Sequence, residues 1–318
     1  VGAPPSSIGK FGADTDNWVF PRHTGDFSLF RVYDENGNAF TPDQHLKVNI
    51  APRTPGEFTM VFGYPGRTQE YLTAVEMDQL VNVENARRVE IRDVLLSIMD
   101  SEMRADAEVQ LKYASKYARI ANGWKKWIGQ IEGVQFSKGL DRKRKLEAEF
   151  TARIAADANL WDKYSGLLNE IAVNNTQIAE GQLKRNEFIE TIYYGMEWFS
   201  LMSKLQRAKS DVDMDVALVE FDQNYSRTVS EKTTAAMLSM ALATFPDLLG
   251  DMDEATFVST LHNEIDALVE LATKDEPIEL TKVAPTASNF NTSAFQAFYA
   301  VSPDNTLLQK GTELSAEY

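Results

Sequence analysis

The sequence of 318 residues contains no cysteine. This absence excludes disulfide bonds, zinc sites built on thiolates and a cysteine nucleophile. Histidine is also scarce. The three histidines are far apart and none belongs to an H-E-x-x-H zinc motif: His23, His45 and His262. The sequence therefore predicts no metal site built on cysteine or histidine.

Long apolar runs are missing as well. No stretch reaches the ~18 to 20 apolar residues of a membrane span, so we expect none. The first residues, VGAPPSSIGKFG, have neither the basic end nor the apolar segment of a signal peptide, and the chain does not begin with methionine. We therefore expect the chain to be an internal part of a longer protein.

Positive charge is in short supply. The chain has 47 acidic and 32 basic residues, a formal net charge of −15. Such a surface repels a phosphate backbone unless a local basic patch intervenes. The best such patch, Lys138 to Lys145, is followed at once by acidic residues, and we interpret it as a solvated helix face. The charge balance predicts no nucleic-acid partner.

Two segments resemble ligand-binding loops but lack residues that those loops require. The sequence GYPGRT, residues 63–68, lacks the lysine and the glycine spacing of a phosphate-binding loop. Residues 211–222, DVDMDVALVEFD, resemble a calcium loop, but Val216 stands where the turn needs glycine and Asp222 replaces the usual glutamate. We interpret the latter segment as a polar connection. The sequence predicts no cofactor and no metal.

The first 67 residues have the pattern of short strands. Phe27 to Tyr33 is rich in aromatic and β-branched residues, and Asp34 to Asn38 contains the Asn-Gly of a tight hairpin turn. About four short strands are expected in this region. The apolar residues expected to form their core are Phe30, Val32, Val48, Met60 and Phe62.

From residue 68 onward, apolar residues recur at three- and four-residue spacings, which predicts helices. One long helix is expected from about 86 to 131. Others are expected at 142–171, 176–208, 230–249 and 254–273. The predicted fold class is α+β, mostly α: a partial β-barrel segment followed by a large α-helical bundle.

Asp26 stands directly before the expected strand at Phe27 to Tyr33. It allows two interpretations. The first is a polar turn residue that caps the strand. The second is the acid that holds a catalytic histidine in its reactive tautomer. His23 is too near in sequence to be an obvious partner, and we interpret it as structural.

Three segments in order carry a family resemblance: residues 8–33 (IGKFGADTDNWVFPRHTGDFSLFRVY), 58–73 (FTMVFGYPGRTQEYLT) and 112–133 (KYASKYARIANGWKKWIGQIEG). They resemble the dipeptidyl-peptidase VII/XI family of bacterial serine exopeptidases. The resemblance implies a chymotrypsin-like barrel with an inserted helical cap. It divides the chain into a partial barrel at 1–67, a helical cap domain at 68–285, and a tail at 286–318. The resemblance assigns no structure to the tail. One option is that the tail returns toward the peptidase domain.

The resemblance also implies an activity, the removal of dipeptides from the free N-terminus of a peptide by a Ser-His-Asp triad. Asp26 matches the triad aspartate. Asn17 and Trp18 match the pair that lines the pocket for the substrate's amine, and Asn122 matches the asparagine that the helical domain adds to it. An ammonium group has three donors and no acceptor, so converging amide oxygens suit it. The family further implies a peptide partner, a homodimer, and a periplasmic or cell-surface location in a Gram-negative bacterium.

The chain also departs from the family. Ala13 replaces a usual glycine, and Val19 and Phe20 replace a usual Met-Trp pair. The triad histidine and serine have no counterpart, so we expect the chain by itself to be inactive. The alternative is a non-catalytic helical module for peptide binding or assembly on the same scaffold.

Overall fold

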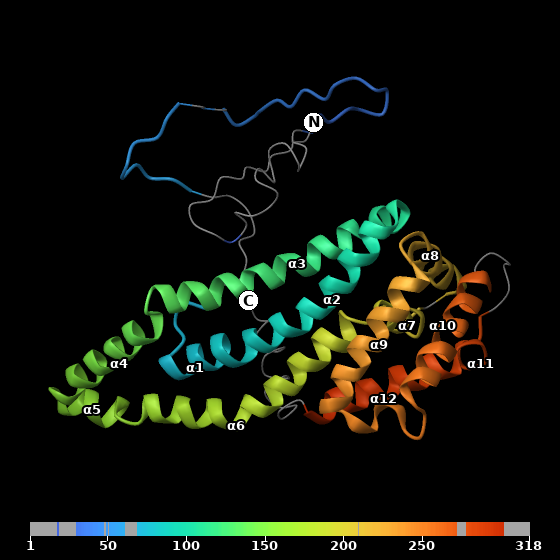
Figure 1. Cartoon of the computed structure of the whole chain (residues 1–318). Helices are drawn as coiled ribbons and strands as arrows, with labels where there is room; N and C mark the ends of the chain where they lie inside the picture. Colours follow the sequence, from blue (N-terminus) through green and yellow to red (C-terminus); the bar gives the residue numbers. More distant parts are fainter. Residues whose placement is uncertain are drawn as a thin grey trace. The chain divides into compact units, whose positions relative to one another are not determined.

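The computed structural model describes residue 18 and residues 30–47, 49, 51–60, 69–208, 210–271 and 278–301. The chain divides into two compact units, Val1–Tyr71 and Leu72–Tyr318. Figure 1 shows that the second unit holds the helices. Among the described residues, every helix is too short or too polar to cross a lipid bilayer.

The predicted β-barrel segment is wrong. In the described part of the first unit, one isolated bridge joins Tyr33 to Ala39 and no strand forms. The turn between them does form, with Gly37 at a φ of 81° and the Asp34 carboxylate accepting from the amides of Asn36 and Asn38 at 3.0 and 2.8 Å.

The side chains predicted for the barrel core explain the failure. Phe30, Val32 and Met60 are 88%, 64% and 75% exposed, while Val48 and Phe62 lie outside the described residues. A two-stranded hairpin with no second layer over its apolar face is marginal in water. The described structure is therefore α-helical. It agrees with the prediction of a mostly α chain and contradicts the prediction of a β-barrel segment.

The helical unit begins with a long rod made of α1 (Ala74–Asp78), the π-helical segment η2 (Gln79–Asn85) and α2 (Ala86–Ala105). Thr73 caps it through a capping box: its hydroxyl accepts from the Glu76 amide at 3.3 Å, and the Glu76 carboxylate accepts from the Thr73 amide at 2.8 Å.

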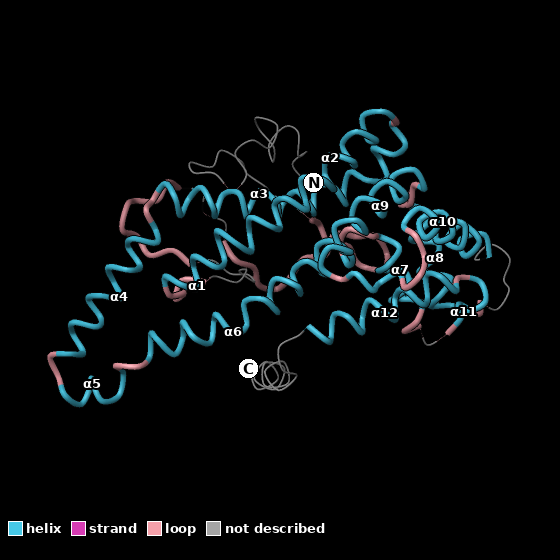
Figure 2. The backbone as a smooth tube through the Cα atoms, turned by 60° about the horizontal axis from the view of Figure 1, so that its bottom comes forward, coloured by secondary structure: helices cyan, strands magenta, loops and turns pink. Residues whose placement is uncertain are grey.

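The single helix predicted from 86 to 131 is instead a helical hairpin. It breaks at Asp106, whose backbone is extended and whose carboxylate accepts from the Glu108 amide at 2.8 Å, beginning α3 (Ala107–Phe136). Aspartate is a strong N-cap, because its side chain satisfies an amide that the helix leaves free. Figures 1 and 2 show α3 running back along α2.

After α3 the chain runs away from the hairpin and returns. It forms α4 (Gly139–Ala155), the short α5 (Ala158–Tyr164), α6 (Leu167–Glu187) and a second π-helical segment, η3 (Phe188–Tyr193). Both views place α5 at the far end of this arm (Figures 1 and 2). The basic stretch lies on α4, where Arg144 pairs with Asp141 at 3.3 Å on the exposed surface.

The remaining helices gather at the other end of the helical unit (Figure 1). Their bounds are α7 (Glu197–Leu205), α8 (Asp211–Gln223), α9 (Arg227–Thr244), the 3-10 helix η4 (Pro246–Leu249), α10 (Glu254–Leu271), α11 (Leu280–Val283) and α12 (Pro285–Val301).

Two of these helices correct the sequence interpretation. The aspartate-rich segment predicted as a polar connection is the first part of α8, which Ser210 caps by accepting from the Asp213 amide at 3.2 Å. The start of the tail left without structure is α12, which buries Phe290 and Ala294.

The core of the helical unit is a cluster of aromatic side chains from η3, α7, α10 and α12. Trp198 is fully buried and packs edge-on against Phe290, with ring centroids 5.4 Å apart. Its indole N–H donates to the Thr234 hydroxyl at 3.1 Å, so the one polar atom of the ring is satisfied. The other buried rings of the cluster are Phe188, Phe199 and Phe257.

Candidate functional site

The helix α3 presents Asn122 at its surface. Its neighbours Ile120 and Ala121 are buried against the rest of the unit, whereas Asn122 is exposed. The side chain therefore lies at the surface of a long helix, which is a rigid element of the kind that holds binding groups in place.

Directly behind Asn122, a buried ion pair fixes the course of α3. The Arg92 guanidinium on α2 donates to the Glu190 carboxylate of η3 at 2.6 and 3.2 Å. A further N–H of Arg92 donates to the backbone carbonyl of Ile120 at 2.7 Å. Both charged groups are almost fully buried, at 9% and 4% side-chain exposure. The guanidinium also lies over the Trp127 ring, 4.3 Å from its centroid.

Gly123 explains why this close contact is possible. A Cβ atom at this position would lie 2.3 Å from Nη1 of Arg92, which is far inside van der Waals contact. The glycine beside Asn122 therefore lets the guanidinium approach the backbone of α3. In the sequence alone, Asn122 and Gly123 are recognisable only as part of a motif. Its packing reason needs Arg92, 31 residues earlier in the chain.

Of the four predicted site residues, the structure describes Trp18 and Asn122. Asn17 and Asp26 lie outside the described residues. Trp18 is 46% exposed with a left-handed backbone, φ 63°, and belongs to the first unit, whereas Asn122 belongs to the second.

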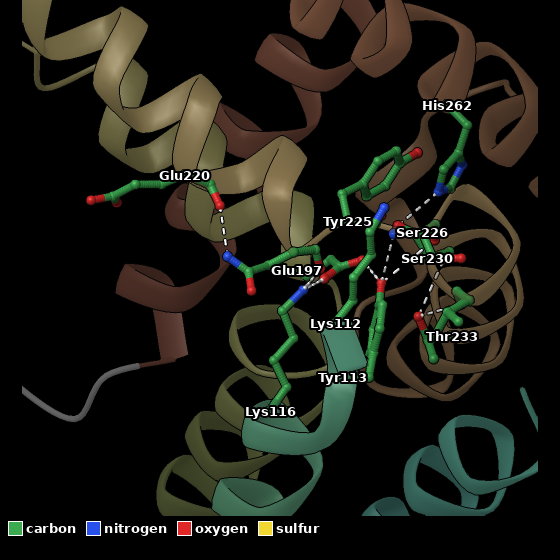
Figure 3. Close-up of polar contacts among 12 residues, drawn as sticks. Lys112, Tyr113, Lys116, Glu197, Glu220, Tyr225, Ser226, Ser230, Thr233 and His262 are labelled. Atoms are coloured by element: carbon green, nitrogen blue, oxygen red, sulfur yellow. Dashed lines mark hydrogen bonds and ion pairs between the residues drawn. The ribbon is translucent and has the colours of Figure 1, made fainter. Parts of the chain in front are cut away.

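In the helical turns that precede Asn122, α3 contacts α7 through a polar cluster (Figure 3). The buried Tyr113 hydroxyl donates to one carboxylate oxygen of Glu197 and accepts from the Ser226 amide at 3.2 Å. Lys116 pairs with the other oxygen of Glu197 and donates to the Asn224 carbonyl. Burial raises the pKa of Tyr113, so the phenol stays protonated and the cluster acts as a structural clamp.

Figure 3 also shows a serine–histidine contact that resembles a nucleophile and its base. Nε2 of His262 lies 3.0 Å from the Ser230 hydroxyl, and Nδ1 lies 2.7 Å from the Val258 carbonyl. The carbonyl can only accept, so Nδ1 carries the proton and Nε2 accepts from serine. Both side chains are buried, at 0% and 1% exposure, and burial lowers the pKa of His262. A peptide cannot reach this pair, which is a packing contact between α9 and α10.

Within the described ranges, no group of three or more His, Asp or Glu side chains is arranged to hold a metal ion. The aspartates that resembled a calcium loop belong to the helix α8, which cannot wrap around a cation as that loop does.

A sequence model described as Peptidase S46 matches residues 1–300. The chain belongs to this family. The resemblance to dipeptidyl-peptidases of the VII/XI type is thereby confirmed. This chain is 38% identical over 263 residues to the Asp/Glu-specific dipeptidyl-peptidase of Flavobacterium psychrophilum. The matched region covers 76% of this chain and 37% of that protein.

A second S46 relative is the dipeptidyl-peptidase 7 of Porphyromonas endodontalis, 34% identical over 255 residues, with 76% of this chain and 31% of that protein covered. Among solved structures, the chain is similar to Porphyromonas endodontalis DPP11 in complex with the dipeptide Arg-Glu, with a TM-score of 0.73 and 25% identity. That match covers 94% of this chain and 48% of the solved one. This S46 chain thus spans about a third of these curated relatives and about half of the solved one.

Proposed function

We propose that this chain is the part of a dipeptidyl-peptidase that holds the free amine of a peptide's N-terminus. The observation that supports the proposal most is Asn122, an exposed amide on a helix whose course the buried Arg92 and Gly123 fix. The amide oxygen accepts one N–H of the ammonium. Asn17 supplies a second acceptor and Trp18 an aromatic wall.

The reaction proposed is hydrolysis of the second peptide bond by a serine nucleophile. In this scheme Asp26 orients the catalytic histidine and stabilises its charged form while serine attacks the carbonyl carbon. The histidine and the serine come from parts of the peptidase that are not in this sequence, so the isolated chain binds peptide without cleaving it. A homodimer and a periplasmic or cell-surface location are further proposals that rest on the family resemblance.

The amine pocket predicts a binding preference that the isolated chain itself can show. A tetrapeptide with a free N-terminus should bind more tightly than its Nα-acetylated form, because acetylation removes the charge and two donors. Hydrogen bonds to a charged group are worth ~1.5–3 kcal/mol, so Asn122→Ala should weaken binding of the free peptide about ten- to a hundredfold. Isothermal titration calorimetry measures both differences.

A matched control for this variant is Asn82→Ala. Asn82 is also exposed on the helical rod and contacts Asp78 at 2.5 Å, far in sequence from the motif. Its loss should leave the dissociation constant unchanged. Equal affinity for free and acetylated peptide, with Asn122→Ala without effect, would remove the amine pocket from the account.

A further inference from the structure

A cleft opens between α3, the η3–α7 connection and α8, beside the polar cluster of Figure 3. Its volume is about 720 Å³. Pockets that bind small molecules commonly measure ~300–1,000 Å³. Asn122 is not among the described residues that line this cleft, so the cleft is a site apart from the proposed amine pocket.

The charge of the lining is opposite to that of the chain. Among the described lining residues, four are cationic and two are anionic, which gives +2 in a chain of net charge −15. A positive concavity on an acidic protein concentrates anionic ligands. The cations are Lys112, Lys116, Arg119 and Lys204, and the anions are Glu197 and Glu220.

The cations on α3 differ in what they already bind. Lys116 pairs with Glu197, and Lys112 pairs with Glu108 at 3.1 Å. Arg119 is exposed, and its guanidinium makes no ion pair or hydrogen bond with any residue that the structure describes. A guanidinium offers five donors in a planar fork that matches a carboxylate. Arg119 is therefore the cation of α3 that is open to a ligand.

The cation on α7 is held only loosely. Nζ of Lys204 lies 3.7 Å from the Glu220 carboxylate, and the two side chains are 58% and 65% exposed. Exposed ion pairs of this kind contribute little to stability, so a ligand can replace the Glu220 carboxylate at small cost. The cleft thus offers an anion one free guanidinium from α3 and one available ammonium from α7.

The η3–α7 connection adds aromatic surface to the cleft. Tyr193 and Tyr194 both line it, and they stand edge-on with ring centroids 5.2 Å apart. Their side chains are 39% and 47% exposed, so a ligand can reach both rings. Burying aromatic surface against an apolar group is favourable. A ligand that fits this lining carries an apolar part next to its negative charge.

The lining discriminates between kinds of anion. A small inorganic ion would reach the cations but leave the two rings and most of the volume unfilled. A peptide carboxylate, from a free C-terminus or from an acidic side chain, brings the charge and the apolar neighbouring side chains together.

We propose that this cleft binds a peptide carboxylate through Arg119 and Lys204, with the apolar side chains of the peptide against Tyr193 and Tyr194. It is a second anchor for peptides, and it requires no free N-terminus. The proposal therefore stands independently of the amine pocket at Asn122.

Calorimetry on the 318-residue chain tests this with peptides whose N-terminus is blocked. Acetyl-Ala-Ala-Phe with a free C-terminus should bind about ten- to a hundredfold more tightly than its C-terminal amide, because the amide loses the charge that Arg119 meets. Acetyl-Ala-Glu-Phe-amide distinguishes the two sources of the carboxylate. If it binds as tightly as the free acid, the cleft accepts acidic side chains as well; if it binds as weakly as the Ala amide, the cleft takes the C-terminus.

Arg119→Gln should remove the advantage of the free acid over the amide. Arg119 is exposed, so the variant should keep the circular dichroism spectrum of the parent. Arg153→Gln is the matched control, since Arg153 is an exposed arginine on α4, outside the described lining, and the net charge changes equally. The control should keep the full advantage of the free acid.

Three results would overturn the inference. One is equal affinity for both amides and the free acid, and another is the same loss in Arg119→Gln and Arg153→Gln. The third comes from acetate, which has the charge without an apolar part and should bind at least about tenfold more weakly than the free acid. Equal binding of acetate would reduce the cleft to a site for simple anions. Since every peptide here has a blocked N-terminus, none of these results bears on the amine pocket.

Discussion

Asp26→Asn should lower kcat of a peptidase that contains this chain by about 10⁴-fold, with little change in its melting temperature. The amide cannot hold the catalytic histidine in the tautomer that accepts the serine proton, nor stabilise the imidazolium that forms. The effect belongs to the chemical step, so KM should change far less than kcat. Steady-state hydrolysis of a fluorogenic dipeptide substrate measures it.

Asp34→Asn is the comparison for this variant. Asp34 stands at a turn in the first unit, where its carboxylate accepts from the amides of Asn36 and Asn38. An asparagine keeps an oxygen for these bonds, so kcat should stay within about twofold of the parent, as expected for a surface substitution away from the chemistry. A near-normal kcat for Asp26→Asn would leave Asp26 as the turn residue of the alternative interpretation.

Arg92→Met should lower the free energy of unfolding of the helical unit by about 3–5 kcal/mol, because it leaves the buried Glu190 carboxylate without its cation. The variant also removes the donor to the Ile120 carbonyl, beside Asn122. Urea denaturation followed by circular dichroism measures the change, and the peptide titrations above show whether the binding of free amines weakens with it.

Two further variants sharpen this result. Arg104→Met removes an exposed pair with Asp100, whose side chains are 79% and 42% exposed, and should cost no more than about 0.5 kcal/mol. The double variant Arg92→Met with Glu190→Leu should recover part of the loss, since it removes the stranded charge. A cost below about 1 kcal/mol for Arg92→Met alone would show that Glu190 finds another partner or a proton.

The helices were predictable where local signals decide them. The three- and four-residue spacing predicted α10 nearly to its bounds and most of α9, because each buries apolar side chains in its own unit. The same spacing missed the break at Asp106. Apolar residues continue on both sides of it, and only the N-cap chemistry of that aspartate marks the reversal.

The β-barrel could not be judged from local pattern. Strand-like residues such as Phe30 and Val32 require partner strands and a covering layer, which are non-local, and both side chains are exposed here. The start of the tail was missed for a related reason. Its Ser, Thr and Asn residues are typical of loops, yet packing of Phe290 and Ala294 against the core makes it helical.

The candidate site, too, was predictable from the sequence only in part. Asn122 was predicted from the family resemblance, whose motif at this position lies within one segment of the chain. The reasons for the neighbouring Gly123 lie in Arg92 and Glu190, which tertiary packing brings together from α2 and η3.

Mass spectrometry of the products from a peptidase that contains this chain tests directly whether dipeptides are released from a free N-terminus. The substrate is one decapeptide, supplied with a free and with an acetylated N-terminus. We expect successive dipeptides from the free N-terminus and no cleavage of the acetylated peptide. Release of single residues, internal cleavage, or equal cleavage of both peptides would contradict it.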